Sequence, residues 1–212
     1  GSLDLPANPE NGLGLLLLAA LGDETFTAQD PDSDSTDEVG EHVFTPAETL
    51  PSLSVEVDRD TDVVRHLGAG VDTLELSHTN EDMLTASADL IAKEPDPSVA
   101  SASPSYSDLR NFRWNDISLT VDGSTRDTDV LEASFSIENN LDPKFRGSRT
   151  LSKMGVGERP ITASLTLDFE NTDLFEKFLG AAAATSPQDQ LTTIGVEATW
   201  TSPEKIADTS TG

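Results

Sequence analysis

Apolar and polar residues alternate along most of the chain beyond residue 50. A period of two is typical of β-strands that bury one face and expose the other. The alternating segments are residues 53–57, 73–77, 84–90, 117–121, 131–137, 161–169 and 194–200. The pattern therefore predicts a mostly β protein.

Two segments predict helices instead. Residues 13–21 are rich in leucine and end at Gly22, as a short buried helix closed by a glycine would. Residues 172–184 predict an amphipathic helix that Thr172 and Asp173 can cap, with Glu176 placed for a capping box to Asp173. Its apolar face would consist of Leu174, Phe175, Phe178 and Leu179.

These patterns divide the chain into an N-terminal segment (1–22), an acidic loop (23–49), a β domain (50–206) and a C-terminal tail (207–212). Within the β domain, residues 94–109 are rich in Pro and Ser and predict a further loop. The expected fold class is mostly β, a two-sheet sandwich or barrel with one amphipathic flanking helix and long loops.

The net charge of the chain indicates the salt concentration in which the protein works. The 212 residues include 39 acidic and 13 basic side chains, which gives a formal charge of −26. That charge excludes nucleic-acid binding through phosphate contacts, which need Lys and Arg. Molar salt shortens the Debye length to about 3 Å and screens the self-repulsion. We expect a protein of an extreme halophile or its virus, and a charge-balancing partner in ordinary salt is the alternative.

Catalytic and cofactor chemistry is not predicted. The chain contains no cysteine, and His42, His66 and His78 fall in no metal-ligand spacing. It lacks nucleophile-elbow, phosphate-loop and zinc-helix motifs. The longest apolar run, residues 13–21, is shorter than the roughly 20 residues of a membrane span. No cofactor, enzymatic activity or membrane association is expected, and because the first basic residue is Arg59, no secretory signal peptide either.

The acidic loop is a weak candidate for calcium binding. Its carboxylates follow much of the spacing of a calcium-binding loop, but Ser35 stands where the sharp turn needs glycine. A solvated loop explains the same residues, which are Asp30, Asp32, Asp34, Glu38 and Glu41.

A basic segment interrupts the acidic chain between residues 139 and 159. Its cations are Lys144, Arg146, Arg149 and Lys153, with no acidic residue between them. A solvated basic loop is one interpretation. Docking on the acidic surface of another copy explains the segment better, since surfaces of opposite sign allow head-to-tail assembly into rings or filaments.

Several stretches, taken in order, resemble the tail tube (major tail) proteins of long-tailed viruses. They are residues 5–12 with the leucine run, residues 50–57, the strand 71–77, and the hairpin from Val130 through residues 147–149 to Phe169 with the helix after it. The acidic composition suggests a virus of halophilic archaea. The order of the parts carries the resemblance, which spans most of residues 3–200 and matches the acidic loop least.

The resemblance implies a structural virion protein of the tail, assembled in the host cytoplasm as stacked hexameric rings together with other tail proteins. Each subunit would give four strands to an inner barrel through which DNA passes without specific binding, and the N-terminal segment or the acidic loop would reach the adjacent ring. The residues expected to line the lumen are Thr85, Ser87, Asp89, Glu132, Ser134, Ser136, Glu138, Thr162, Ser164, Thr166 and Asp168. A monomeric acidic β-sandwich used for adhesion or binding is the alternative.

Overall fold

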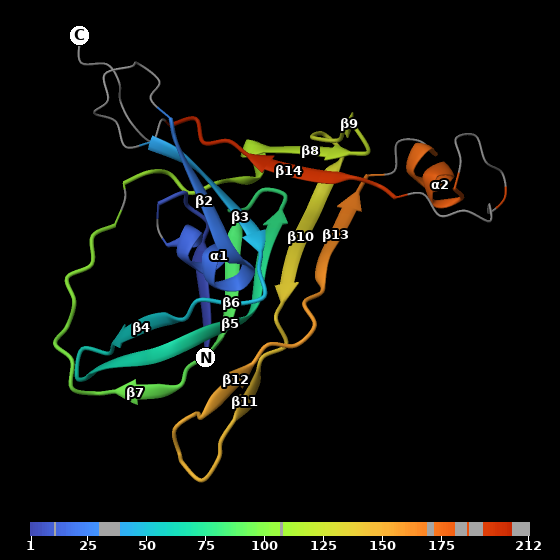
Figure 1. The fold of residues 1–212 in the computed structure, drawn as a ribbon. Coiled ribbons are helices and arrows are strands. Elements are labelled where there is room, and N and C mark those ends of the chain that lie inside the picture. The colour runs from blue at the N-terminus through green and yellow to red at the C-terminus, as the bar shows by residue number, and fades with distance from the viewer. Residues whose placement is uncertain are drawn as a thin grey trace.

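A computed structural model describes residues 1–10, 12–29, 39–106, 108–168, 172–180, 186 and 193–204. Its helices are α1 (Leu13–Leu21) and α2 (Asp173–Phe178), with a 3₁₀ turn at Trp114–Asp116. Its strands are β1 (Ser2–Pro6), β2 (Gly22–Gln29), β3 (Val39–Pro46), β4 (Leu53–Asp58), β5 (Val63–Thr79), β6 (Thr85–Ile91), β7 (Glu94–Asp96), β8 (Ile117–Val121), β9 (Ser124–Thr125), β10 (Val130–Glu138), β11 (Asp142–Lys144), β12 (Lys153–Gly155), β13 (Ile161–Leu167) and β14 (Val196–Trp200). The predicted mostly β class is confirmed (Figure 1).

Strand β5 is the central strand of the main sheet. Its second half lies in an antiparallel sheet of order β1-β6-β5-β10-β13, and its first half pairs with β4 and β7. Gly68, between the two halves, has a φ of 60°, which favours glycine. In Figure 1 the β4–β5–β7 part extends away from the rest of the sheet.

The apolar face of the main sheet is covered by two separate elements. Helix α1 packs on one region, where Leu16 and Ala20 meet Val71 and Leu74. The small sheet β14-β8-β9 covers another region, where Leu119 and Val121 meet Ala133 and Val130. The alternation of apolar and polar residues directs one face of each strand into this core and leaves the other face uncovered.

Both predicted helices are present. Helix α1 ends at Leu21, and Gly22 closes it in the left-handed conformation, as expected. Helix α2 has Thr172, one of its two expected caps, at the N-cap position, and the Thr172 hydroxyl donates a hydrogen bond to Glu176.

The expected apolar face of α2 is partly buried. Leu174 and Leu179 are covered, whereas Phe175 is 56% exposed. The alanines at 181–184, expected to extend the helix, lie outside the described residues.

The segment expected to be an acidic loop contains an antiparallel hairpin. Strands β2 and β3 pair along their whole lengths, from Gly22–Pro46 to Gln29–Val39. Phe26 packs on His42, and His42 stacks on Phe44 and pairs with the carboxylate of Glu24. The prediction of a continuous loop over 23–49 is wrong because β-forming residues flank the acidic run and pair across it.

The structure describes the N-terminal segment but not the predicted C-terminal tail. Residues 1–22 are part of the main fold, since β1 pairs with β6 and α1 lies in the core. Residues 205–212, which include the predicted tail, lie outside the described residues.

A buried asparagine and an arginine join four parts of the chain. Asn139, just beyond β10, is fully buried and donates hydrogen bonds to the carbonyls of Ala20 (3.0 Å) and Val71 (2.9 Å). Its side-chain oxygen accepts a hydrogen bond from Nε of Arg159, which also donates to the carbonyls of Leu21 and Ala47. The Asn139–Arg159 pair therefore fixes α1 and the end of β3 to the main sheet.

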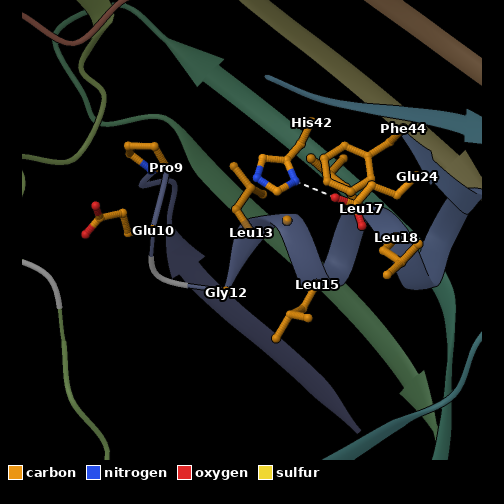
Figure 2. Close-up of a pocket in the computed structure, with 11 residues that line it drawn as sticks. Pro9, Glu10, Gly12, Leu13, Leu15, Leu17, Leu18, Glu24, His42 and Phe44 are labelled. Atoms are coloured by element: carbon orange, nitrogen blue, oxygen red, sulfur yellow. Dashed lines mark hydrogen bonds and ion pairs between the residues drawn. The ribbon is translucent and has the colours of Figure 1, made fainter. Parts of the chain in front are cut away.

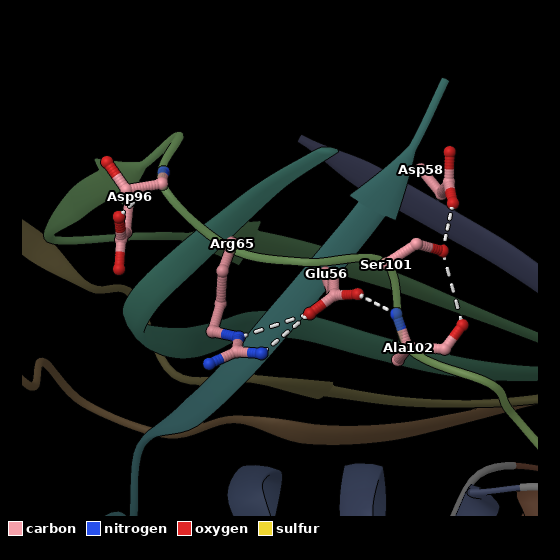
Figure 3. Close-up of polar contacts among 7 residues, drawn as sticks. Glu56, Asp58, Arg65, Asp96, Ser101 and Ala102 are labelled. Carbon is pink, nitrogen blue, oxygen red and sulfur yellow. Dashed lines mark hydrogen bonds and ion pairs between the residues drawn. The ribbon is translucent and has the colours of Figure 1, made fainter. Parts of the chain in front are cut away.

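The expected Pro/Ser-rich loop crosses β4 and is held there by two carboxylates (Figure 3). The amide of Ala102 and the guanidinium of Arg65 both donate to Glu56, at 2.9 and 2.8 Å. The Ser101 hydroxyl donates to Asp58. The bond from Arg65, and then that from Ala102, lowers the pKa of Glu56, and the bond from Ser101 lowers the pKa of Asp58.

His78 is the buried histidine of the main sheet. It is 3% exposed and its Nδ1 accepts a hydrogen bond of 3.3 Å from the indole N–H of Trp200, so Nε2 carries the proton. Burial lowers the pKa of His78 because the charged ring would lose its hydration.

We expect Asn139→Ala to destabilise the fold. It removes the acceptor of Arg159 Nε and the side-chain donor of the Ala20 and Val71 carbonyls, at a cost of about 1–3 kcal/mol for each buried group that is left unpaired. Chemical denaturation would measure the free energy of unfolding. The control Thr166→Ala removes an exposed hydroxyl bond to Glu132 and should change stability by less than about 0.5 kcal/mol. Equal stabilities of the two variants would contradict the role of the Asn139–Arg159 pair.

We also expect stability to fall as the pH is lowered through the histidine range. With a lowered pKa in the folded state, His78 binds a proton more readily in the unfolded chain, so the free energy of unfolding decreases between about pH 7 and pH 5. His78→Gln, which retains an acceptor for Trp200, should reduce this slope. Denaturation midpoints at several pH values would test this, and an unchanged slope in His78→Gln would refute it.

Candidate functional site

The uncovered face of the main sheet brings the predicted lumen residues together. The strand register aligns them in rows that run across β6, β5, β10 and β13. The rows are Ser87, Glu75, Ser136 and Thr162; Thr85, Ser77, Ser134 and Ser164; Thr79, Glu132 and Thr166; and Asp89, Thr73 and Glu138. We call these rows the polar face. Asp168, the remaining predicted residue, directly follows β13.

The polar face is acidic. Its carboxylates are those of Glu75, Asp89, Glu132 and Glu138, and Asp4 of β1 lies opposite Ser87 in the adjoining strand. None of the described residues in the rows is a Lys, Arg or His. Two of these carboxylates accept hydrogen bonds from hydroxyl groups of the same face. Ser77 donates to Glu75 at 2.8 Å, and Thr166 donates to Glu132 at 3.3 Å.

The rows contain residues that the sequence analysis did not assign to the site. Thr73, Glu75, Ser77 and Thr79 of β5 occupy the middle of the face. Their alternation with Leu74 and Leu76 in the sequence indicates that they lie on the polar side of their strand. The sheet order then places that strand between the predicted strands β6 and β10.

The main sheet ends in two open edges. Among the described strands, β13 pairs only with β10, and β1 pairs only with β6. Ile161, on the apolar side of β13, is 56% exposed, and Leu3 of β1 is also exposed. Unpaired backbone groups with exposed apolar residues form a template for another strand.

The predicted interface cations all lie on one projecting hairpin, formed by β11, β12 and residues 145–152, which we call the basic hairpin (Figure 1). Lys144 and Lys153 are paired in register at its stem, and Arg146 and Arg149 lie in its tip. Lys144 pairs with Asp142 of the same hairpin at 3.0 Å, and within the described chain neither tip arginine forms an ion pair. Phe145 in the tip is 59% exposed.

The base of the basic hairpin is tightly packed. Leu141 and Leu151 are buried, and a Cβ added at Gly70 of β5 would lie 2.8 Å from the sulfur of Met154 and 2.9 Å from Leu141. The Asp72 carboxylate accepts a hydrogen bond from the Leu141 amide at 2.7 Å. The core thus anchors the hairpin, and the tip alone is free of the fold.

Most of the calcium candidates lie outside the described residues. Of the calcium candidates, Asp30, Asp32, Asp34 and Glu38 lie outside the described residues, and Glu41 lies on β3. The described residues include no cluster of three or more potential metal ligands. They also include no helix with the length and apolarity needed to cross a membrane.

The described residues thus combine an amphipathic sheet that has an acidic, hydroxyl-rich face and two open edges with a projecting basic hairpin. A model of the phage tail tube protein family matches residues 1–211, so the chain belongs to that family. The family is structural and not enzymatic, and its members form the tube of the virion tail. No match was found among curated proteins.

Membership of this family favours a tube subunit over the alternative of a monomeric binding module.

Proposed function

We propose that the protein assembles as stacked hexameric rings with the polar face lining the lumen, and that the resulting tube conducts viral DNA during ejection. The observation that carries this proposal is the continuous polar face, which spans four neighbouring strands without a cation. A wall of carboxylates and hydroxyls stays hydrated and repels phosphates, so DNA slides past it without binding.

The open edges support a closed ring. Pairing of β13 in one subunit with the opposite edge of the next would remove every exposed edge of the main sheet. With four strands per subunit, roughly 24 strands spaced about 4.8 Å apart and tilted about 45° give a backbone diameter of about 50 Å. Side chains then leave a channel of about 40 Å, which admits duplex DNA. Closure through β1 adds a fifth strand per subunit, so roughly 30 strands would widen the backbone diameter to about 65 Å.

The acidity supports a haloarchaeal virus as the source. A formal charge of −26 disfavours close packing of subunits unless concentrated salt screens it. We therefore propose assembly in the salt-rich cytoplasm of the host, with other tail proteins at the ends of the tube.

The basic hairpin is proposed as a contact between subunits. Arg146 and Arg149 are exposed on an anchored support, and a second copy of this acidic chain offers them carboxylates, which favours a specific contact over a solvated loop.

Reversing charge on the polar face should slow DNA passage. We expect virions that carry Glu132→Lys with Asp168→Lys to assemble tails but eject DNA about tenfold or more slowly, because lumenal lysines would bind phosphates. Ejection would be timed in vitro by the release of dye-accessible DNA. The matched control, Asp62→Lys with Glu48→Lys, makes the same charge change at exposed sites off the polar face. Equal ejection rates for both variants would contradict a lumenal polar face.

A further inference from the structure

A pocket lies beside α1, next to the β2–β3 hairpin (Figure 2). It has a volume of about 520 Å³, and we call it the α1 pocket. Its walls are mainly apolar, from Leu13, Leu17 and Phe44. Leu15 at its margin is 61% exposed. A pocket of this kind on an otherwise highly charged chain calls for an apolar occupant.

The α1 pocket also carries negative charge. Glu10 is exposed at one side, and Glu24, on β2, contacts His42 at the other (Figure 2). No Lys or Arg is among its described lining residues. The pocket therefore suits an aromatic or aliphatic side chain flanked by cations.

The tip of the basic hairpin has this chemistry. Phe145 is exposed between Lys144 and Arg146, and Arg149 follows in the same turn. The tip is ordered by its own hydrogen bonds, since the Arg146 amide donates to the Ser152 hydroxyl at 3.2 Å. An anchored and ordered tip loses little conformational entropy when it binds.

The pocket at the base of the basic hairpin does not fit this tip. It is lined by Lys93 and Lys153, whose charge would repel the arginines. Within one chain, the hairpin tip points away from α1 (Figure 1). A second copy of the chain can supply the α1 pocket without bending the hairpin.

We propose that the tip of the basic hairpin, with Phe145 as its apolar anchor, seats in the α1 pocket of a neighbouring copy, its arginines beside Glu10 and Glu24. The two surfaces differ, so the contact is head-to-tail and repeats from subunit to subunit. In molar salt only charges in contact interact strongly. Phe145 then provides most of the affinity, and the ion pairs set the register. This contact rests on the proposed assembly into a tube and specifies one of its joints.

Cysteine cross-linking tests the contact directly, because the native chain has no cysteine. An equal mixture of Arg146→Cys and Glu10→Cys proteins, assembled in molar salt and oxidised, should give covalent dimers that contain one of each. The matched control replaces Arg146→Cys with Tyr106→Cys, at an exposed aromatic in the Pro/Ser-rich loop, and should give none. Cross-linking at the same level in both mixtures, or in neither, would overturn the proposal.

Substitution of the anchor gives a second, independent readout. Phe145→Ser should raise the protein concentration needed for assembly by about tenfold or more, whereas Phe145→Leu and Tyr106→Ser should leave it near that of the native chain. Arg146→Glu with Arg149→Glu should leave monomers, because it replaces the attraction to Glu10 and Glu24 with repulsion at contact distance, and tubes formed by this variant would contradict the contact.

The failure of this contact can be told from the failure of the proposed function. If Phe145→Ser forms normal tubes, and the Arg146→Cys and Glu10→Cys proteins give no mixed dimer, the contact is refuted while the proposed tube stands. If the native chain forms no tubes, the same cross-linking in concentrated solution still decides the contact.

Discussion

The fold depends on satisfying one buried polar side chain. Asn139 is enclosed at the point where β10 leaves the main sheet, and its amide can be buried only because Ala20, Val71 and Arg159 provide all its partners. The same bonds fix α1 on the apolar face and, through Arg159, the end of β3. The basic hairpin starts three residues later, at Asp142, directly after Leu141, whose amide donates to the Asp72 side chain. Both proposed contact surfaces, the hairpin and the α1 pocket, thus take their positions from this pair.

The two faces of the main sheet separate stability from function. The apolar face supplies the core with α1 and the β8–β14 layer, whereas the polar face contributes little packing and is left to solvent. Substitutions on the polar face should therefore change what passes over it without unfolding the subunit. The charge has a cost, because so acidic a surface resists assembly unless salt screens it. Apolar contacts such as the one proposed for Phe145 keep their strength in such salt.

The sequence predicts the strands well because alternation is a local property, and Gly22 marks the end of α1 for the same reason. It also identified the polar positions of β6, β10 and β13. What it lacked was the strand order, which places β5 between them and adds Glu75 and Ser77 to the face. The β2–β3 hairpin was missed because the acidic run obscured short strands whose pairing is seen only across the chain. The α1 pocket arises from this hairpin packing beside α1, so no local pattern could predict it.

A cryo-electron microscopy reconstruction of tubes assembled in molar salt would show which way the polar face is turned. We expect a continuous inner barrel in which Glu75, Ser134 and Ser164 face the channel and α1 lies on the outer side of the wall. A tube in which this face is turned outward, or is buried between subunits, would contradict it.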